Sequence, residues 1–283
     1  MRRLEQAALA RSIVAEQEGA LIPLHTQRLL LPGCEPFVIR RLLSDTPKHL
    51  RSAGPKPNPF LPWDQRLEVE RLNHSHALIL NKFPVQRGHL LLITQSWQPQ
   101  AGWLQRNDWQ VLGAVEADTP GLWFFNSSPA AGASQPHRHL QLLPRQPDEP
   151  SCPLAPVLRA QLAGDAEPWP WRYCLSRRQA GPDSDSAAVA AELENLYLQH
   201  CRALGLGDPA QDAAPRHPYN LLFDGHWLMT VLRSREHAAG FSVNALGFAG
   251  GLLITEASDQ GWLERHGPLA LLQTVAVPRA DSA

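Results

Sequence analysis

The chain has 283 residues, of which 43% are hydrophobic and 19% are charged, and its formal net charge is −1. This composition is typical of a globular protein with one large domain or two small ones, and it argues against wholesale disorder. The sequence lacks the basic stripe that duplex nucleic-acid binders carry, so we expect no nucleic-acid partner.

Cysteine usage and targeting signals bear on the cellular compartment. The four cysteines lie far apart and form no CxxC pair, which argues against a structural zinc site and against a disulfide framework. The chain starts with basic residues but has no apolar signal-peptide core, and no apolar run approaches the length of a membrane span. We therefore expect a cytoplasmic protein with no membrane partner.

The first 62 residues predict a helix, a strand and a proline-rich loop. Apolar residues recur near the helical period from Leu4 to Ala20, and Phe37 to Leu43 has the pattern of a short strand. Prolines then interrupt the chain from Ser44 to Pro62, in a loop that contains Lys56. This loop is either a plain surface connection or a stiffened loop that presents the Lys56 ammonium group to a polyphosphate.

Two strands and a helix are predicted next. His74 to Leu80 and Leu90 to Ile93 have strand patterns on either side of a turn. Trp97 to Glu116 fits a helix that packs one apolar side on the sheet. The pair His74 and His76 has no glycine turn before it and no glutamine after it, so we expect a structural role for this pair.

The segment from Leu122 to Pro144 carries the most informative pattern. An apolar strand leads through the small residues of a turn into an alternating strand that ends at a proline. Because side chains alternate on a strand, His137, His139 and Gln141 share one face. The turn brings a glycine and several backbone N–H donors beside them, and such a turn can form an anion-binding nest.

A His-x-His pair by itself has three interpretations. It can be half of a site for zinc, copper or iron, a catalytic pair, or two histidines on a half-exposed strand. Gln141 stands where a third metal ligand would be expected, and a neutral amide is a poor ligand for a transition metal. A metal site does not need the glycine turn. Together these features favour nucleophilic phosphoryl chemistry, and we assign no metal ligands.

The composition shifts after Pro144, where four prolines between positions 147 and 156 exclude a long helix. We therefore expect two domains, residues 1–145 and 146–283. In the second, Ala187 to Ala203 predicts a helix, and strands are expected at Tyr219–Phe223, Trp227–Leu232 and Gly251–Ile254. The second domain also repeats an order seen in the first, namely a strand, a turn with a glycine–histidine pair, and a second strand. This is either a degenerate half-repeat or a coincidence of hairpin chemistry.

Several motifs together resemble the transferase branch of the histidine-triad superfamily, and within it the diadenosine tetraphosphate (Ap4A) phosphorylases, or ATP adenylyltransferases. These motifs are Asn126 followed by GASQPH and HxHxQ, Asn81-Lys82-Phe83-Pro84 ahead of Gly88-His89, the loop at Lys56, and the segments Pro218–Leu222 and Ser242–Gly250. They cover most of the chain in the family's order. The resemblance implies an α+β fold with a HIT-like antiparallel sheet flanked by helices, and a C-terminal part that completes the nucleotide cleft.

The resemblance also implies a reaction, in which phosphate and Ap4A give ATP and ADP. His139 would be the nucleophile that attacks the α-phosphorus and forms an adenylyl–histidine intermediate. A neutral imidazole avoids the repulsion between two anions and divides the displacement into two easier steps. His137 would line the pocket and help to orient the His139 ring. Gln141 stands where the hydrolase branch has a third histidine, and its amide can bond phosphate oxygens but cannot act as an acid or base.

The other expected contacts are with the polyphosphate and the nucleoside. Backbone donors of Gly132, Ala133, Ser134 and Gln135 would stabilise the transferring phosphoryl group. By resemblance, nucleotide binding would involve Lys56, Asn81, Lys82, Asn126, Asn244, Ala245 and Leu246. Thr255 stands where family members usually have a lysine, a departure that would remove one phosphate contact. No tightly bound cofactor is expected, although magnesium could accompany the nucleotide.

Three other functions compete with this interpretation. They are a different histidine nucleotidyltransferase such as a hexose-phosphate uridylyltransferase, a metal-dependent enzyme with His-x-His ligands, and a nucleotide sensor without turnover. The motifs outside the HxHxQ strand and the lack of cysteine pairs argue against the first of these. The expected partners are small molecules, namely a dinucleoside polyphosphate, ATP, ADP and phosphate.

Overall fold

A computed structural model describes residues 2–44, 58–181 and 184–279 of the chain. Its helices are α1 (Arg3–Gln17), α3 (Arg106–Val115), α4 (Ala155–Ala163), α5 (Ser186–Leu204), α6 (Ala245–Ala249) and α7 (Gln260–Val275). Its strands up to the site are β1 (Thr26–Leu29), β2 (Val38–Leu42), β3 (Glu68–Leu72), β4 (His76–Leu80), β5 (Leu90–Thr94), β6 (Gly121–Asn126) and β7 (His139–Pro144). The later strands are β8 (Tyr173–Arg177), β9 (Tyr219–Phe223), β10 (Trp227–Leu232), β11 (His237–Ala238), β12 (Phe241–Ser242) and β13 (Gly251–Ile254).

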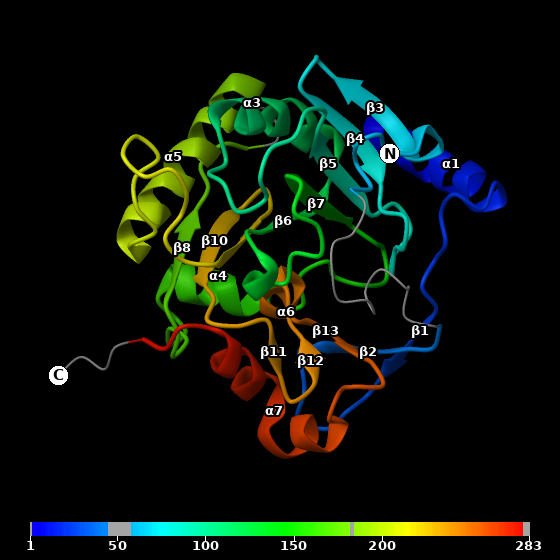
Figure 1. The fold of residues 1–283 in the computed structure, drawn as a ribbon. Helices are drawn as coiled ribbons and strands as arrows, with labels where there is room; N and C mark the ends of the chain where they lie inside the picture. The colour runs from blue at the N-terminus through cyan, green and yellow to red at the C-terminus, as the bar shows by residue number, and fades with distance from the viewer. Residues whose placement is uncertain (1, 45–57, 182–183, 280–283) are drawn as a thin grey trace.

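The main sheet has eight antiparallel strands in the order β3-β4-β5-β7-β6-β9-β10-β8 (Figure 1). A smaller sheet has the order β1-β2-β13, in which β13 runs parallel to β2. In the main sheet β6 pairs with β9, and Asn126 lies opposite Asn220. The sheet therefore continues without a break across the boundary expected at residues 145–146. The expected α+β fold, with an antiparallel sheet flanked by helices, is confirmed.

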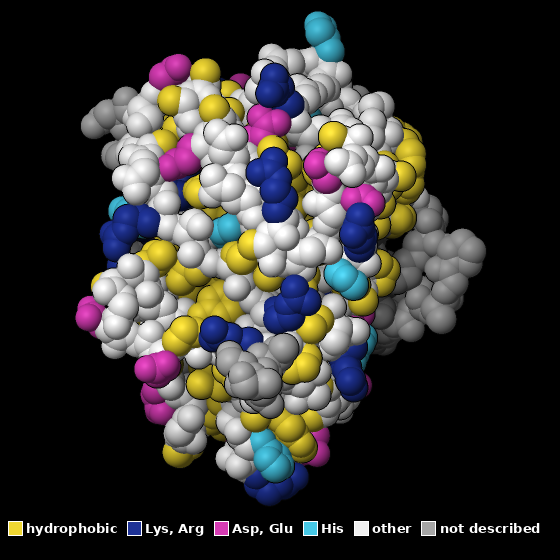
Figure 2. Space-filling view, turned by 90° about the vertical axis from the view of Figure 1, so that its left-hand side faces the viewer, with side chains coloured by type: hydrophobic (Ala, Val, Ile, Leu, Met, Phe, Trp, Pro, Cys, Tyr) yellow, Lys and Arg dark blue, Asp and Glu magenta, His cyan; other side chains and the backbone are white. Residues whose placement is uncertain are grey.

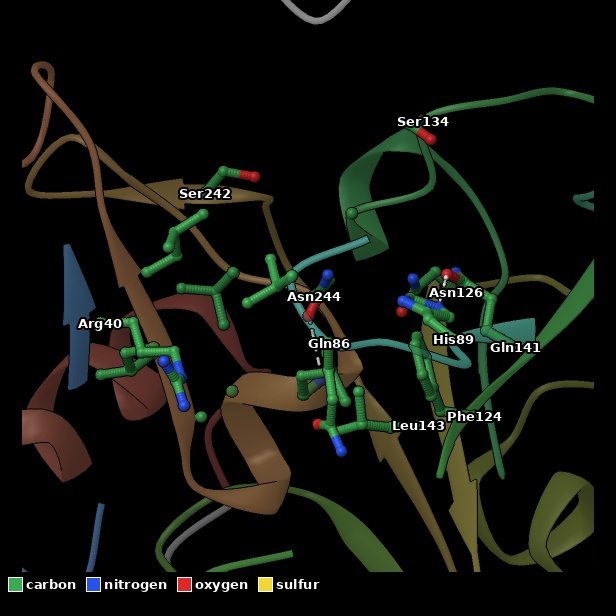
Figure 3. A pocket seen from close by; sticks show the side chains of 18 of the residues that line it. Arg40, Gln86, His89, Phe124, Asn126, Ser134, Gln141, Leu143, Ser242 and Asn244 are labelled. Carbon is green, nitrogen blue, oxygen red and sulfur yellow. Dashed lines mark hydrogen bonds between the residues drawn. The ribbon is translucent and has the colours of Figure 1, made fainter. Parts of the chain in front are cut away.

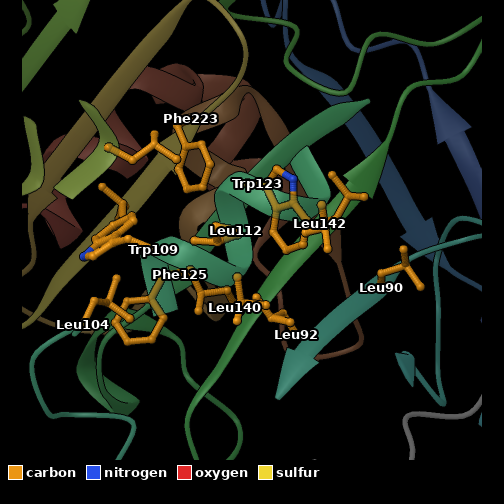
Figure 4. Close-up of a cluster of buried hydrophobic side chains, with 14 of the residues drawn as sticks. Leu90, Leu92, Leu104, Trp109, Leu112, Trp123, Phe125, Leu140, Leu142 and Phe223 are labelled. Carbon is orange, nitrogen blue, oxygen red and sulfur yellow. The ribbon is translucent and has the colours of Figure 1, made fainter. Parts of the chain in front are cut away.

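Helices cover both faces of the main sheet. Helices α1, α3 and α5 pack on one face, where Leu140 and Leu142 of β7 lie in one hydrophobic cluster with Trp109 and Leu112 of α3 (Figure 4). On the other face, α4, α6, α7 and the small sheet pack on the strands from β6 to β10. The predicted alternation of β7 is therefore observed, and it leaves His139 and Gln141 on the face opposite α3.

Several expected elements have the expected bounds. The strands β9, β10 and β13 coincide with their predictions, and the helix expected from Ala187 to Ala203 is α5, which ends before Gly205. Gly205 has a φ of +71°, a left-handed conformation that glycine adopts at helix ends without steric cost.

The helix expected from Trp97 to Glu116 is shorter than predicted, because α3 begins only at Arg106. The segment before it runs beside the site strand instead: Pro99 forms a β-bridge with His137, and the Arg138 N–H donates to the carbonyl oxygen of Gln98. Pro99 is unsuited to a helix interior, since it lacks an N–H donor.

Several other elements, among them β1, β3, β8, α4, α6 and α7, were not expected from the sequence. Helix α7 contains Gly267 and Pro268, and Gly267 has non-helical dihedral angles (φ 79°, ψ 164°). Because glycine and proline usually interrupt a helix, no helix was predicted here, although α7 continues beyond the kink. No helix in the described ranges is long and apolar enough to cross a membrane. On the face shown in Figure 2, basic and acidic side chains are interspersed.

Candidate active site

A cavity of about 1370 Å³ opens on the face of the main sheet opposite α3. Nine of the predicted site residues line it: Asn81, Asn126, Gly132, Ala133, Ser134, Gln135, Gln141, Asn244 and Leu246. Thr255 also lines it. Figure 3 shows His89, Asn126 and Gln141 together at one end, Arg40 at the other, and Asn244 between them. The structure thus brings segments from both halves of the chain around one cavity.

His139 itself does not line the cavity, whereas Gln141, two residues later on the same strand face, does. The His139 ring packs against the ring of Phe60, and 3% of the residue's surface is exposed. Its Nδ1 lies 2.8 Å from the carbonyl oxygen of His137, so Nδ1 carries the proton and Nε2 keeps its lone pair. Within the described ranges, no group hydrogen-bonds Nε2. Burial lowers the pKa of His139 to about 4, so the ring is neutral near pH 7. A neutral imidazole with a free ring nitrogen can act as a nucleophile.

His137 does not line the cavity, contrary to the expected role in the pocket wall. Its Nε2–H donates to the carbonyl oxygen of Thr94 at 2.8 Å, and its Nδ1 accepts from Asn58 Nδ2 at 2.9 Å. These bonds hold the ring between β5 and the loop before Phe60. Its contribution to the site is its carbonyl oxygen, which fixes the tautomer and the orientation of His139.

A hydrogen-bond chain orients the amide of Gln141. The Phe83 N–H donates to Asn81 Oδ1 at 3.1 Å, so Asn81 Nδ2 is the donor to His89 Nδ1 at 3.3 Å. His89 therefore carries its proton on Nε2, which lies 3.2 Å from Gln141 Oε1. Burial lowers the pKa of His89 to about 4. The ring is therefore neutral near pH 7, and its Nδ1 remains an acceptor for Asn81. The NH₂ group of Gln141 remains to donate into the cavity.

The amide of Asn126 is oriented in the same way. Its Oδ1 accepts from Asn220 Nδ2 at 2.8 Å and from the Ala245 N–H at 2.9 Å. The Asn126 NH₂ group is therefore the part that faces the cavity. Ala245 contributes through this backbone bond and does not line the cavity, while Asn244 Oδ1 accepts from the Leu246 N–H at 2.9 Å and caps α6.

The glycine turn packs directly on the second half of the chain. Gly132 has a φ of +85°, and a Cβ built there would lie 2.7 Å from Asn244 Cβ and 3.0 Å from the Val243 carbonyl oxygen. Only a residue without a side chain allows both this conformation and this approach. The turn of the first half and the turn before α6 therefore form one continuous wall.

The opposite face of β7 is fixed by a buried ion-pair network. Arg138 Nη1 lies 3.1 Å from Asp108 Oδ2, and His76 Nε2 lies 2.9 Å from Asp108 Oδ1. All three side chains are at most 3% exposed. The network ties β4 and β7 to α3 behind the site, which agrees with the structural role expected for His76. His74, the other histidine of that pair, is exposed.

Gln100 supports the site, a role that was not predicted from the sequence. Its Oε1 accepts from the His139 N–H at 2.8 Å, and its Nε2 donates to the Asn126 carbonyl oxygen at 2.7 Å. The side chain thereby fixes the backbone of the histidine relative to that of the asparagine. Gln100 lies in the segment that was predicted to be helical, so no sequence pattern placed it next to the site strand.

Of the two predicted lysines, the structure describes Lys82 alone. Lys56 lies outside the described residues. Lys82 is exposed, its Nζ lies 5.8 Å from the centroid of the Phe83 ring, and it does not line the cavity. Arg40 is a cation of the cavity wall, where it pairs with Glu149. In the described part of the chain, no three His, Cys, Asp or Glu side chains cluster as a metal site would require.

The chain is similar to known proteins over nearly its whole length. The sequence models of the Ap4A phosphorylase N-terminal domain and the ATP adenylyltransferase C-terminal domain match residues 1–160 and 167–278. Protein APA1 of Saccharomyces cerevisiae is 29% identical over 205 residues, which are 64% of this chain and 62% of that protein. Diadenosine 5',5'''-P1,P4-tetraphosphate phosphorylase 2 of the same organism is 27% identical over 229 residues, 70% of this chain and 69% of that protein.

A solved structure shares the fold. The crystal structure of yeast Ap4A phosphorylase Apa2 in complex with Ap4A superposes with a TM-score of 0.73 at 21% sequence identity, covering 98% of each chain. The two domain models match consecutive parts of the chain, and both parts contribute strands to the main sheet. The chain therefore belongs to the Ap4A phosphorylase family, with its N-terminal phosphorylase domain and its C-terminal ATP adenylyltransferase domain.

Proposed function

We propose that this protein is a nucleotidyltransferase that cleaves Ap4A by phosphorolysis and releases ATP and ADP. The observation that carries the proposal is the neutral His139 ring, whose Nε2 has no hydrogen-bond partner within the described ranges and whose strand neighbour Gln141 is one of two oriented amides that line the cavity. The family to which the chain belongs, and a relative named as an Ap4A phosphorylase, support the same substrate.

The reaction has two displacements at the same phosphorus. In the first, His139 Nε2 attacks the α-phosphorus, the N–P bond forms, and the bond to the bridging oxygen breaks so that ATP leaves with the electron pair. In the second, an oxygen of inorganic phosphate attacks the same phosphorus, the N–P bond breaks, and ADP leaves. His139 is then again neutral, and neither step requires a side chain that titrates near pH 7.

The cavity wall supplies the donors for the transferring phosphoryl group. The NH₂ groups of Gln141 and Asn126 are the free ends of oriented amides, and Ser134 and the backbone of the glycine turn line the same wall. Preorganised donors of this kind stabilise charge that develops in a transition state. We propose that magnesium would enter bound to the polyphosphate, because the oxygens that chelate it belong to the nucleotide.

The test is the covalent intermediate. We expect mass spectrometry of protein incubated with Ap4A without phosphate to show one added AMP unit, which phosphate then removes as ADP. His139→Asn should lose the adduct while keeping its fold and its AMP binding. His226→Asn, at an exposed position, serves as the control and should retain the adduct. An adduct of equal yield in His139→Asn would refute the assignment.

The same preparations separate the competing functions. Release of ATP and ADP from Ap4A plus phosphate excludes a sensor without turnover. Bound zinc or iron in a one-to-one ratio with the purified protein would instead favour a metal enzyme.

A further inference from the structure

Arg233 lies just after β10, with 1% of its surface exposed, and its guanidinium group is enclosed behind the cavity wall. All five of its N–H groups have an acceptor. Nε donates to the Val275 carbonyl oxygen at 3.1 Å, Nη1 to Asn220 Oδ1 at 2.6 Å and to the Ala131 carbonyl oxygen at 3.3 Å, and Nη2 to the Arg235 and Val243 carbonyl oxygens at 2.7 and 2.8 Å.

These acceptors solvate the charge of Arg233 but do not neutralise it. Each of them is an uncharged oxygen, and no carboxylate within the described ranges lies at ion-pair distance from this side chain, although the charge of Glu236 raises its pKa from farther away. Burial lowers the pKa of Arg233 to about 10, so the group remains a cation near pH 7. Arg178 shows the contrast, since it is equally buried but paired with Glu116 and Glu192.

An unpaired buried charge is costly, so its location matters. Two of its acceptors are the residues just before Gly132 and Asn244, the two turns that form the cavity wall. One guanidinium thus holds both turns. A nucleotide bound in the cavity would place its phosphate charge against this wall.

The bond to Asn220 also connects Arg233 to the cavity. Arg233 Nη1 donates to Asn220 Oδ1 at 2.6 Å, Asn220 Nδ2 donates to Asn126 Oδ1 at 2.8 Å, and the Asn126 NH₂ group faces the cavity. All the donors in this chain point in one direction, from the cation toward the cavity. Hydrogen bonds aligned in this way polarise one another, so the last NH₂ group becomes a stronger donor.

We propose that Arg233 and Asn220 form a polarised relay, which presents the charge of a buried cation to the phosphate of a nucleotide through the amide of Asn126. Arg233 is in this sense a positioning residue. The inference rests on the proposed function only in taking a nucleotide as the ligand. It predicts a selective effect: the relay strengthens binding of the phosphorylated ligand and leaves binding of the nucleoside unchanged.

Calorimetric titration of the full chain with AMP and with adenosine tests the relay. Asn220→Asp keeps the size of the side chain but places a carboxylate against Arg233, which neutralises the cation and removes the donor to Asn126. We expect AMP to bind about tenfold or more weakly, and adenosine within about twofold of the unaltered protein. Arg233→Met should give the same pattern where it folds. Arg178→Met is the control, because it removes a buried cation whose partners Glu116, Glu192 and Asp224 all lie outside the cavity lining.

Two results would overturn the proposal. One is an equal loss of AMP and adenosine affinity in Asn220→Asp, which is what a purely structural role predicts. The other is unchanged AMP affinity in that variant. Since AMP binding requires no turnover, an absence of Ap4A phosphorolysis in a protein that shows the selective effect would refute the proposed reaction and leave the relay standing.

Discussion

The contact between the two turns of the cavity wall can be tested with Gly132→Ala. An alanine Cβ at this position would lie 2.7 Å from Asn244 Cβ, well inside van der Waals contact, at a φ of +85°. The left-handed conformation costs a residue with a side chain about 1–2 kcal/mol. Overpacking against the second turn adds about 1–3 kcal/mol. We therefore expect the free energy of unfolding to fall by about 2–5 kcal/mol.

Gly164→Ala separates these two contributions. Gly164 has nearly the same φ, +84°, but no heavy atom lies within 4 Å of a Cβ built there. This variant should lose only the conformational part, about 1–2 kcal/mol. Urea denaturation of both variants measures the difference, and calorimetric titration measures AMP affinity. Because the added methyl group pushes Asn244 and Gly132 apart, AMP affinity should fall in Gly132→Ala and stay unchanged in Gly164→Ala.

An equal loss of stability in the two variants would mean that the turns are not in contact in solution. Strong destabilisation of Gly132→Ala with normal AMP binding would also contradict the expected result. In that case the contact would hold the fold together without shaping the cavity.

Two further predictions concern charged groups. Asp108→Asn leaves the Arg138 guanidinium buried without its carboxylate, so the free energy of unfolding measured in urea should fall by about 3–5 kcal/mol. The control Asp64→Asn changes the exposed pair with Arg66 and should lower it by less than about 1 kcal/mol. Equal losses in the two variants would contradict the expected difference. Because burial lowers the pKa of His139 to about 4, the second-order rate constant for adenylylation without phosphate should stay constant from about pH 8 to about pH 5 and fall only as the ring gains a proton near pH 4. An acid limb centred near the ordinary histidine value of about 6.5 would show that the ring is not buried before the nucleotide binds.

The sequence predicted the reactive face of β7 because that face depends on local geometry. Alternation on a strand is fixed by the backbone, so Leu140 and Leu142 on the apolar face place His139 and Gln141 on the other. The His137 ring lies on the same side as that of His139, since Phe60 packs against both rings. Strand alternation could not show that Thr94 and Asn58 would hold the His137 ring, because those residues are distant in the sequence.

The supporting residues were missed because their partners are far away in the sequence. Gln100 and His139 are 39 positions apart, and Asn220 and Asn126 are 94 apart. The second pair exists because β6 and β9 pair in one register, which no local pattern specifies. Arg233 had no signal of its own, since one arginine after an apolar strand usually pairs with a carboxylate or with solvent.

The second half of the chain lacks the HxHxQ strand, yet the site depends on it. Asn126 belongs to β6, but its amide is oriented by Asn220 and by the backbone of Ala245, both in the second half. Gly132 likewise packs against Asn244. The first half therefore carries the proposed nucleophile, whereas the second half orients the Asn126 amide and encloses the buried cation. Neither half alone could form the cavity wall in this geometry, so the strand pairing that joins the halves also assembles the candidate site.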